Sequence, residues 1–69
     1  MCDNNYVDFE GDGCQTYHDA EWCTATGEYG PEWNTAEGHT FAAYPDPSTG
    51  LTALSCELCG CGIYYCSIF

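Results

Sequence analysis

The segment from Asp8 to Asp19 carries oxygen-bearing side chains at the spacing of a calcium-binding loop. It begins Asp-x-Glu-x-Asp-Gly, so acidic side chains at the first, third and fifth positions can converge on one ion, and glycine at the sixth permits a sharp turn. A carbonyl at the seventh position and a carboxylate at the twelfth would complete the shell. The predicted ligands are Asp8, Glu10, Asp12, Cys14, Thr16 and Asp19. The alternative is a solvated acidic turn, because the eighth position is the polar Gln15.

Cysteine is the second group with chemistry. Four of the seven thiols fall within eleven residues, in the pattern Cys-x-x-Cys-x-Cys-x4-Cys, which can bind zinc or an iron–sulfur cluster. In an oxidising compartment the same thiols would instead pair with those of the N-terminal third of the chain, and we favour this interpretation. The disulfide candidates are Cys2, Cys14, Cys23, Cys56, Cys59, Cys61 and Cys66. Because seven is odd, at least one cysteine must be free, joined to another chain or otherwise modified. The disulfide connectivity stays open.

Aromatic residues and histidines supply the remaining chemistry. Eleven aromatic side chains include Trp22 and Trp33, which could stack on sugar rings, although in a chain this small most aromatics are expected in the core. The two histidines, His18 and His39, are the side chains that normally titrate near neutral pH. No phosphate-binding loop, catalytic triad or haem-attachment motif accompanies them. We therefore expect a protein that is not an enzyme.

Composition limits the partners. The chain has 69 residues, 11 acidic residues and no Lys or Arg, which gives a formal net charge of -11. Without cations it cannot neutralise phosphates, so nucleic-acid binding is excluded, and an anionic membrane would repel it. No apolar stretch is long enough to span a bilayer. The cysteine content predicts an extracellular location. Residues 1–20 contain no leader, so we expect that Met1 lies within a longer precursor or replaces a processed start.

The elements that must position these groups are short, because glycine and proline interrupt the sequence often. We predict one or two helical turns over residues 19–25 with Asp19 as N-cap, a turn over residues 45–50, and a helix over residues 52–58 with Thr52 as N-cap. The aromatic and β-branched residues 63–69 predict a strand. The fold class is therefore a small, irregular, disulfide-rich domain with short helices and a C-terminal β-strand, divided into an acidic cysteine-rich module (1–62) and an apolar tail (63–69).

Residues 6–62 resemble a cysteine-rich module of secreted proteins from diatoms, dinoflagellates and oomycetes. The resemblance rests on an aromatic-x-Asp-x-x-Gly-x-x-Cys-x-x-Tyr segment starting at Tyr6, on Trp22-Cys23, on a Gly/Tyr/Trp stretch, and on the Cys/Gly-rich end of the module. Glu57 replaces the second of two adjacent cysteines in that pattern, and Cys61 stands in its glycine run. The resemblance implies an extracellular module without a settled biochemical activity.

The apolar tail suggests assembly. An exposed aromatic strand invites pairing with another chain, and the predicted interface residues are Ile63, Tyr64, Tyr65, Ile68 and Phe69. Cys2 or Cys66 could join such subunits covalently. Our first functional hypothesis is an extracellular structural protein whose copies assemble into a filament or surface layer. The alternative is a monomeric module that binds calcium or glycans.

Overall fold

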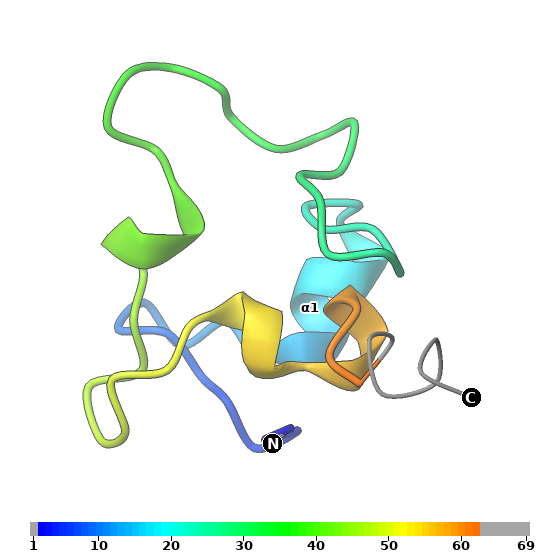
Figure 1. The fold of residues 1–69 in the computed structure, drawn as a ribbon. Coiled ribbons are helices and arrows are strands. Elements are labelled where there is room, and N and C mark those ends of the chain that lie inside the picture. Colours follow the sequence, from blue (N-terminus) through cyan, green and yellow to red (C-terminus); the bar gives the residue numbers. More distant parts are fainter. Residues whose placement is uncertain (1, 63–69) are drawn as a thin grey trace.

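Residues 2–62 fold into one short α-helix, three single-turn 3-10 helices and long connecting loops. The computed structural model describes residues 2–62. Its elements in chain order are α1 (Cys14–Asp19), η1 (Phe41–Ala43), η2 (Ala53–Ser55) and η3 (Glu57–Cys59) (Figure 1). No strand forms within these residues, where the β-type pairings are the isolated bridges Val7↔Gly13 and Cys23↔Tyr29. The small, irregular, disulfide-rich domain is thereby confirmed, and the strand predicted over residues 63–69 lies outside the described part.

Three disulfides tie the N-terminal third of the chain to the C-terminal cysteine cluster. They are Cys2–Cys61, Cys14–Cys56 and Cys23–Cys59, with sequence separations of 59, 42 and 36 residues. A cross-link between residues this far apart lowers the conformational entropy of the unfolded chain. Each bridge should therefore raise the free energy of unfolding by roughly 4 kcal/mol. Such staples are needed because a chain below about 70–80 residues rarely has a sufficient core. The seventh cysteine, Cys66, lies outside the described residues.

Helix α1 begins where Gly13 turns the chain and ends at Asp19. Its residues Cys14 and Tyr17 are buried, and their three-residue spacing puts both on the same face. The helix predicted over residues 19–25 is therefore wrong, because Asp19 is the last residue of α1 and not an N-cap. Beyond it Glu21 adopts a positive φ of 59°, and the Trp22 N–H bonds to the Tyr17 carbonyl at 2.9 Å. The burial of Cys14 and Tyr17 outweighs the capping preference of aspartate.

The segment over residues 52–58 forms two short 3-10 turns in place of the predicted continuous helix. Thr52 is the N-cap of η2, as predicted, and its side chain accepts a hydrogen bond from the Leu54 N–H. Cys56 then takes an extended conformation between η2 and η3, with φ -78° and ψ 134°. This residue bridges to α1 through Cys14, and η3 in turn carries Cys59, which bridges to Cys23. The helix is thus interrupted at Cys56, where two disulfide-bonded cysteines lie three residues apart.

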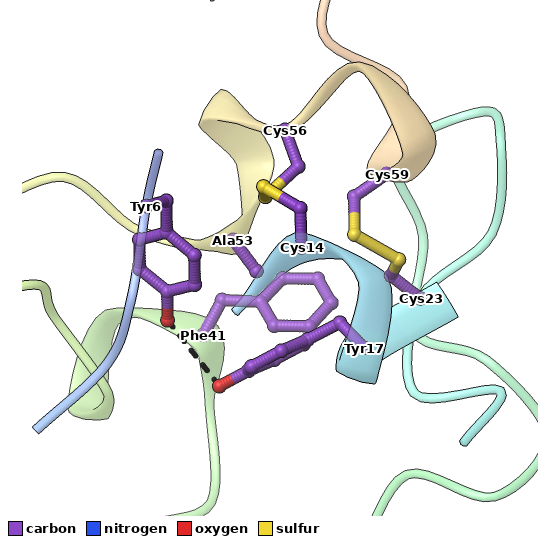
Figure 2. Close-up of a cluster of buried hydrophobic side chains, with 8 residues drawn as sticks. All are labelled: Tyr6, Cys14, Tyr17, Cys23, Phe41, Ala53, Cys56 and Cys59. Atoms are coloured by element: carbon purple, nitrogen blue, oxygen red, sulfur yellow. Dashed lines mark hydrogen bonds between the residues drawn. A yellow bond between two sulfur atoms is a disulfide. The ribbon is translucent and has the colours of Figure 1, made fainter. Parts of the chain in front are cut away.

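The core lies between α1 and the η2–η3 segment, where two of the disulfides run side by side (Figure 2). Tyr6, Tyr17, Phe41 and Ala53 pack around them, and Tyr6, Tyr17 and Ala53 are no more than 1 % exposed. Trp22 and Trp33 pack against the edge of this cluster and are only partly buried. The centre of the domain is thus sulfur and aromatic rings, with a rim of tryptophan.

The loop over residues 45–50 turns as predicted and is fastened to the N-terminal segment. Asp46 is buried, and its two carboxylate oxygens accept hydrogen bonds from the N–H groups of Ser48 at 2.8 Å and of Val7 at 3.2 Å. This pairing brings the turn beside the acidic loop. Across residues 2–62 the longest helix has six residues, and none is long and apolar enough to cross a membrane.

Candidate functional site

The acidic loop is organised around the buried carboxylate of Asp8, which is 3 % exposed. Its Oδ1 accepts hydrogen bonds from the backbone N–H groups of Glu10 and Asp12, both at 2.9 Å. Its Oδ2 accepts the hydroxyl of Tyr17 at 2.7 Å. A buried carboxylate needs such donors to offset its desolvation. Asp8 therefore folds the loop back on itself and fixes it to α1.

The loop brings together three of the six predicted calcium ligands. One carboxylate oxygen from each of Asp8, Glu10 and Asp12 lies within 4.8 Å of the others. The remaining three, Cys14, Thr16 and Asp19, belong to α1, so the second half of the segment is helical and does not wrap around the first. Asp19 instead accepts a hydrogen bond from the side chain of Gln15 at 2.8 Å. The oxygen-rich cluster suits a hard cation, and calcium binding remains a prediction.

Two buried tyrosines extend the hydrogen-bonded group inward. The Tyr6 hydroxyl donates to the Tyr44 carbonyl at 2.6 Å, and its oxygen lies 3.3 Å from that of Tyr17 (Figure 2). Burial raises the pKa of Tyr17 far above its ordinary value, and the neighbouring Tyr6 hydroxyl and Asp8 carboxylate raise this pKa further. Burial likewise raises the pKa of Tyr6. Both phenols stay protonated at neutral pH, so Tyr17 keeps the proton that it donates to Asp8.

Aromatic rings pack around the ring of Tyr17. Its ring centroid lies 5.1 Å from that of Trp22 and 6.1 Å from that of Trp33. The two indoles meet nearly at right angles, with centroids 6.4 Å apart and an interplanar angle of 79°. The indole N–H of Trp33 donates to the His39 carbonyl at 2.8 Å and thereby fastens the loop over residues 34–40. Both predicted glycan-stacking residues thus belong to one aromatic cluster.

The acidic loop and the aromatic cluster border a common cavity of about 190 Å³. This cavity unites residues that the sequence analysis assigned to two separate functions. Its lining consists of Asp8, Glu10, Asp12, Tyr17, Trp22, Glu32, Trp33, Asn34, His39 and Tyr44. We call it the acidic–aromatic cavity. Asp8 and Tyr17, which are joined by a buried hydrogen bond, both belong to its lining.

Several residues of the cavity were not anticipated. Glu32, Asn34, His39 and Tyr44 come from the long loop between the Cys23↔Tyr29 bridge and the turn at residue 47, which has no motif and little regular structure. His39 is held at the cavity by a hydrogen bond between its Nδ1 and the Tyr44 hydroxyl, at 3.1 Å. No spacing rule in the sequence indicates these neighbours. The proline and glycine residues predicted a loop here, but they did not predict that this loop lines the cavity.

The predicted interface residues, Ile63 to Phe69, lie outside the described part of the chain, as does the disulfide candidate Cys66. The other predicted cysteines are all in the three bridges. The structure therefore places three of the six metal candidates (Asp8, Glu10 and Asp12) and both glycan candidates around the cavity. It describes no contact that bears on the self-assembly prediction.

No family model, curated protein or solved structure matches the chain. The resemblance to secreted protist modules stays a prediction. The functional argument consequently rests on the geometry and chemistry of the acidic–aromatic cavity.

Proposed function

We propose that this chain is an extracellular, disulfide-stabilised binding module whose ligand occupies the acidic–aromatic cavity. The observation that carries the proposal is the meeting of two partly buried tryptophans with a cluster of carboxylates around one concave site. Binding sites commonly combine aromatic walls with a few polar groups that orient the ligand. The same cavity is relevant to calcium binding and to glycan binding, because three of the calcium candidates and both glycan candidates line it.

Rigidity supports the proposal. The cavity lining includes Tyr17, which is 1 % exposed and is held between Asp8 and the core. The Cys14–Cys56 and Cys23–Cys59 bridges flank this residue in the chain and hold α1 and the following turn in place. A site that is formed before the ligand arrives loses less conformational entropy on binding. The staples therefore serve the site as well as the fold.

The test uses the two tryptophans as reporters, since they are the only ones in the sequence and both line the cavity. Calcium chloride, chitin and cellulose oligosaccharides, and choline chloride are titrated separately into the oxidised protein at constant ionic strength, and indole fluorescence is followed. We expect a saturable change with at least one of these classes and none with the reduced, unfolded chain. A flat response to every class would overturn the proposal.

The structural-subunit hypothesis remains a prediction, and it has an independent test. It depends on residues 63–69, so the native protein should run as covalent oligomers on a denaturing gel without reductant, or lose its assemblies when these residues are deleted. A single monomeric species that shows no association in solution would contradict it.

A further inference from the structure

We propose that the acidic–aromatic cavity binds a substituted ammonium group, such as a quaternary or alkyl ammonium, an inference that rests on the proposed binding function. Carboxylates and near-perpendicular aromatic rings line one cavity in a chain that has no Lys or Arg to occupy it. Three properties of the lining support this ligand class over a sugar or a bare metal ion.

The first property is uncompensated negative charge. Four carboxylates line the cavity, and the whole sequence contains no Lys or Arg that could neutralise them. Asp8 is satisfied by its three hydrogen bonds. Within residues 2–62, by contrast, no hydrogen bond reaches the side-chain carboxylate of Glu10, Asp12 or Glu32. These three groups are available to a positively charged ligand, and their mutual repulsion falls when it binds.

The second property is the arrangement of the rings. Trp33 stands nearly perpendicular to Trp22, at 79°, and to Tyr44, at 84°, and Trp22 stands perpendicular to Tyr17, at 88°. Rings set at right angles present differently oriented faces and edges to the cavity rather than one flat platform. Indole and phenol faces attract organic cations electrostatically, and aromatic boxes are the usual means of recognising quaternary ammonium groups.

The third property is an excess of acceptors over free donors in the lining. The Trp33 indole N–H is engaged by the His39 carbonyl, and the Tyr17 hydroxyl by Asp8. The Tyr44 hydroxyl is paired with His39 Nδ1. Among the described residues, the Trp22 indole N–H and the Asn34 side-chain amide remain as free donors, but the four carboxylates make acceptors the larger group in the lining, whereas sugar hydroxyls both donate and accept hydrogen bonds. An alkyl ammonium group only donates, and a quaternary one needs no hydrogen bond at all, so both match this lining better.

Size and metal preference agree with an organic cation. A cavity of about 190 Å³ has room for about six waters at roughly 30 Å³ each, which is enough for a trimethylammonium head group. A calcium ion takes oxygen ligands alone and would make no use of the partly buried rings of Trp22, Trp33 and Tyr44. The aromatic content of the lining therefore favours an organic over an inorganic cation.

The experiment is isothermal titration of the oxidised protein with choline and with its neutral carbon analogue, in which a quaternary carbon replaces the nitrogen. Lysine amide is run in parallel to separate a peptide-borne ammonium from a free quaternary one, and sodium chloride holds the ionic strength constant. We expect saturable one-to-one binding of choline or lysine amide. The neutral analogue should bind at least about tenfold more weakly, because it lacks the cation–π and charge attraction.

Matched charge variants locate the site. Glu10→Gln and Glu32→Gln each remove one carboxylate from the lining and should weaken binding about fivefold, the effect of one charge at roughly 4 Å in a water-like dielectric. Glu37→Gln removes the same charge from an exposed residue outside the lining and should leave the affinity unchanged. Cooperative denaturant unfolding of each oxidised variant shows that it folds.

The outcomes separate the two proposals. Equal binding of choline and its neutral analogue, or equal weakening by Glu32→Gln and Glu37→Gln, would overturn the ammonium inference. Binding of calcium or an oligosaccharide without any ammonium compound would also overturn it and would leave the proposed binding function standing. No binding by any of these compounds would overturn both.

Discussion

Tyr17 donates its hydroxyl to Oδ2 of Asp8 at 2.7 Å, and this buried hydrogen bond joins α1 to the acidic loop. Both residues line the acidic–aromatic cavity, and both are at most 3 % exposed. The tyrosine belongs to the disulfide-bonded core, whereas the aspartate belongs to a loop with little regular structure. Their pairing transmits the rigidity of the core to the carboxylates around the cavity.

Removing the donor of this pair should destabilise the domain. Tyr17→Phe keeps the ring but leaves Asp8 Oδ2 buried without its partner, so the free energy of unfolding should fall by about 1–3 kcal/mol. Denaturant unfolding of the oxidised protein measures the loss. Tyr29→Phe is the matched control, because the Tyr29 side chain is 44 % exposed and its hydroxyl only accepts a long bond of 3.3 Å from the Phe41 N–H. Losses of equal size in the two variants would contradict the role assigned to Tyr17.

Alkaline pH should weaken the fold through the same residue. The pKa of Tyr17 is raised in the folded state, so above its ordinary value of 10.0 the unfolded chain releases a proton that the folded protein retains. The folded state then binds more protons, and its stability, complete below pH 10, falls as the pH rises further. Unfolding curves at several pH values, collected before the disulfides exchange, measure the slope. Tyr17→Phe should flatten this slope, and an unchanged slope would contradict the prediction.

The calcium prediction can be tested at two of the six candidate ligands. Glu10 belongs to the three-carboxylate cluster, whereas Asp19 lies at the end of α1 and bonds to Gln15. If the cluster binds calcium, the ion should raise the free energy of unfolding by about 2.7 kcal/mol at a free concentration 100 times the dissociation constant. Glu10→Gln should remove most of this gain, and Asp19→Asn should leave it. A gain that Asp19→Asn removes and Glu10→Gln retains would favour the twelve-residue loop predicted from the sequence. If calcium does not raise the free energy of unfolding of the unmodified protein, calcium binding is excluded.

Close packing at Gly60 gives a prediction about the fold alone. This residue has a φ of 102°, and a Cβ there would collide with the backbone of Gly27. Gly60→Ala should therefore cost about 3 kcal/mol or more, from strain and displacement together. Gly50 also has a positive φ, 75°, but faces open space, so Gly50→Ala should cost about 1 kcal/mol, from strain alone. Thermal or denaturant unfolding compares the two, and equal losses would contradict the packing seen at Gly60.

Local signals account for the parts of the structure that the sequence predicted correctly. Thr52 caps a helical turn and the Pro45–Gly50 segment turns because capping and turn preferences act over a few residues. The acidic side chains of the loop come together for the same reason, since Asp8, Glu10 and Asp12 are close neighbours along the chain.

Long-range links account for what the sequence did not predict. The position of α1 depends on the burial of Cys14 and Tyr17, and the break at Cys56 accompanies a bridge to a residue 42 positions away. The cavity needs loop residues such as His39 and Tyr44, which are placed by contacts with Trp33 and with each other. Disulfide pairing could not be deduced from spacing, so the residues that it brings together could not be deduced either.

The central claim, that the acidic–aromatic cavity binds an organic cation, is tested most directly by the indole N–H signals of the two tryptophans in a proton–nitrogen correlation spectrum. Choline is titrated into the oxidised protein at constant ionic strength. Because Trp22 and Trp33 line the same cavity, both signals should move and should fit one dissociation constant. The neutral carbon analogue should move them far less. Indole signals that stay in place, or that drift without saturation by equal amounts for both compounds, would contradict the account.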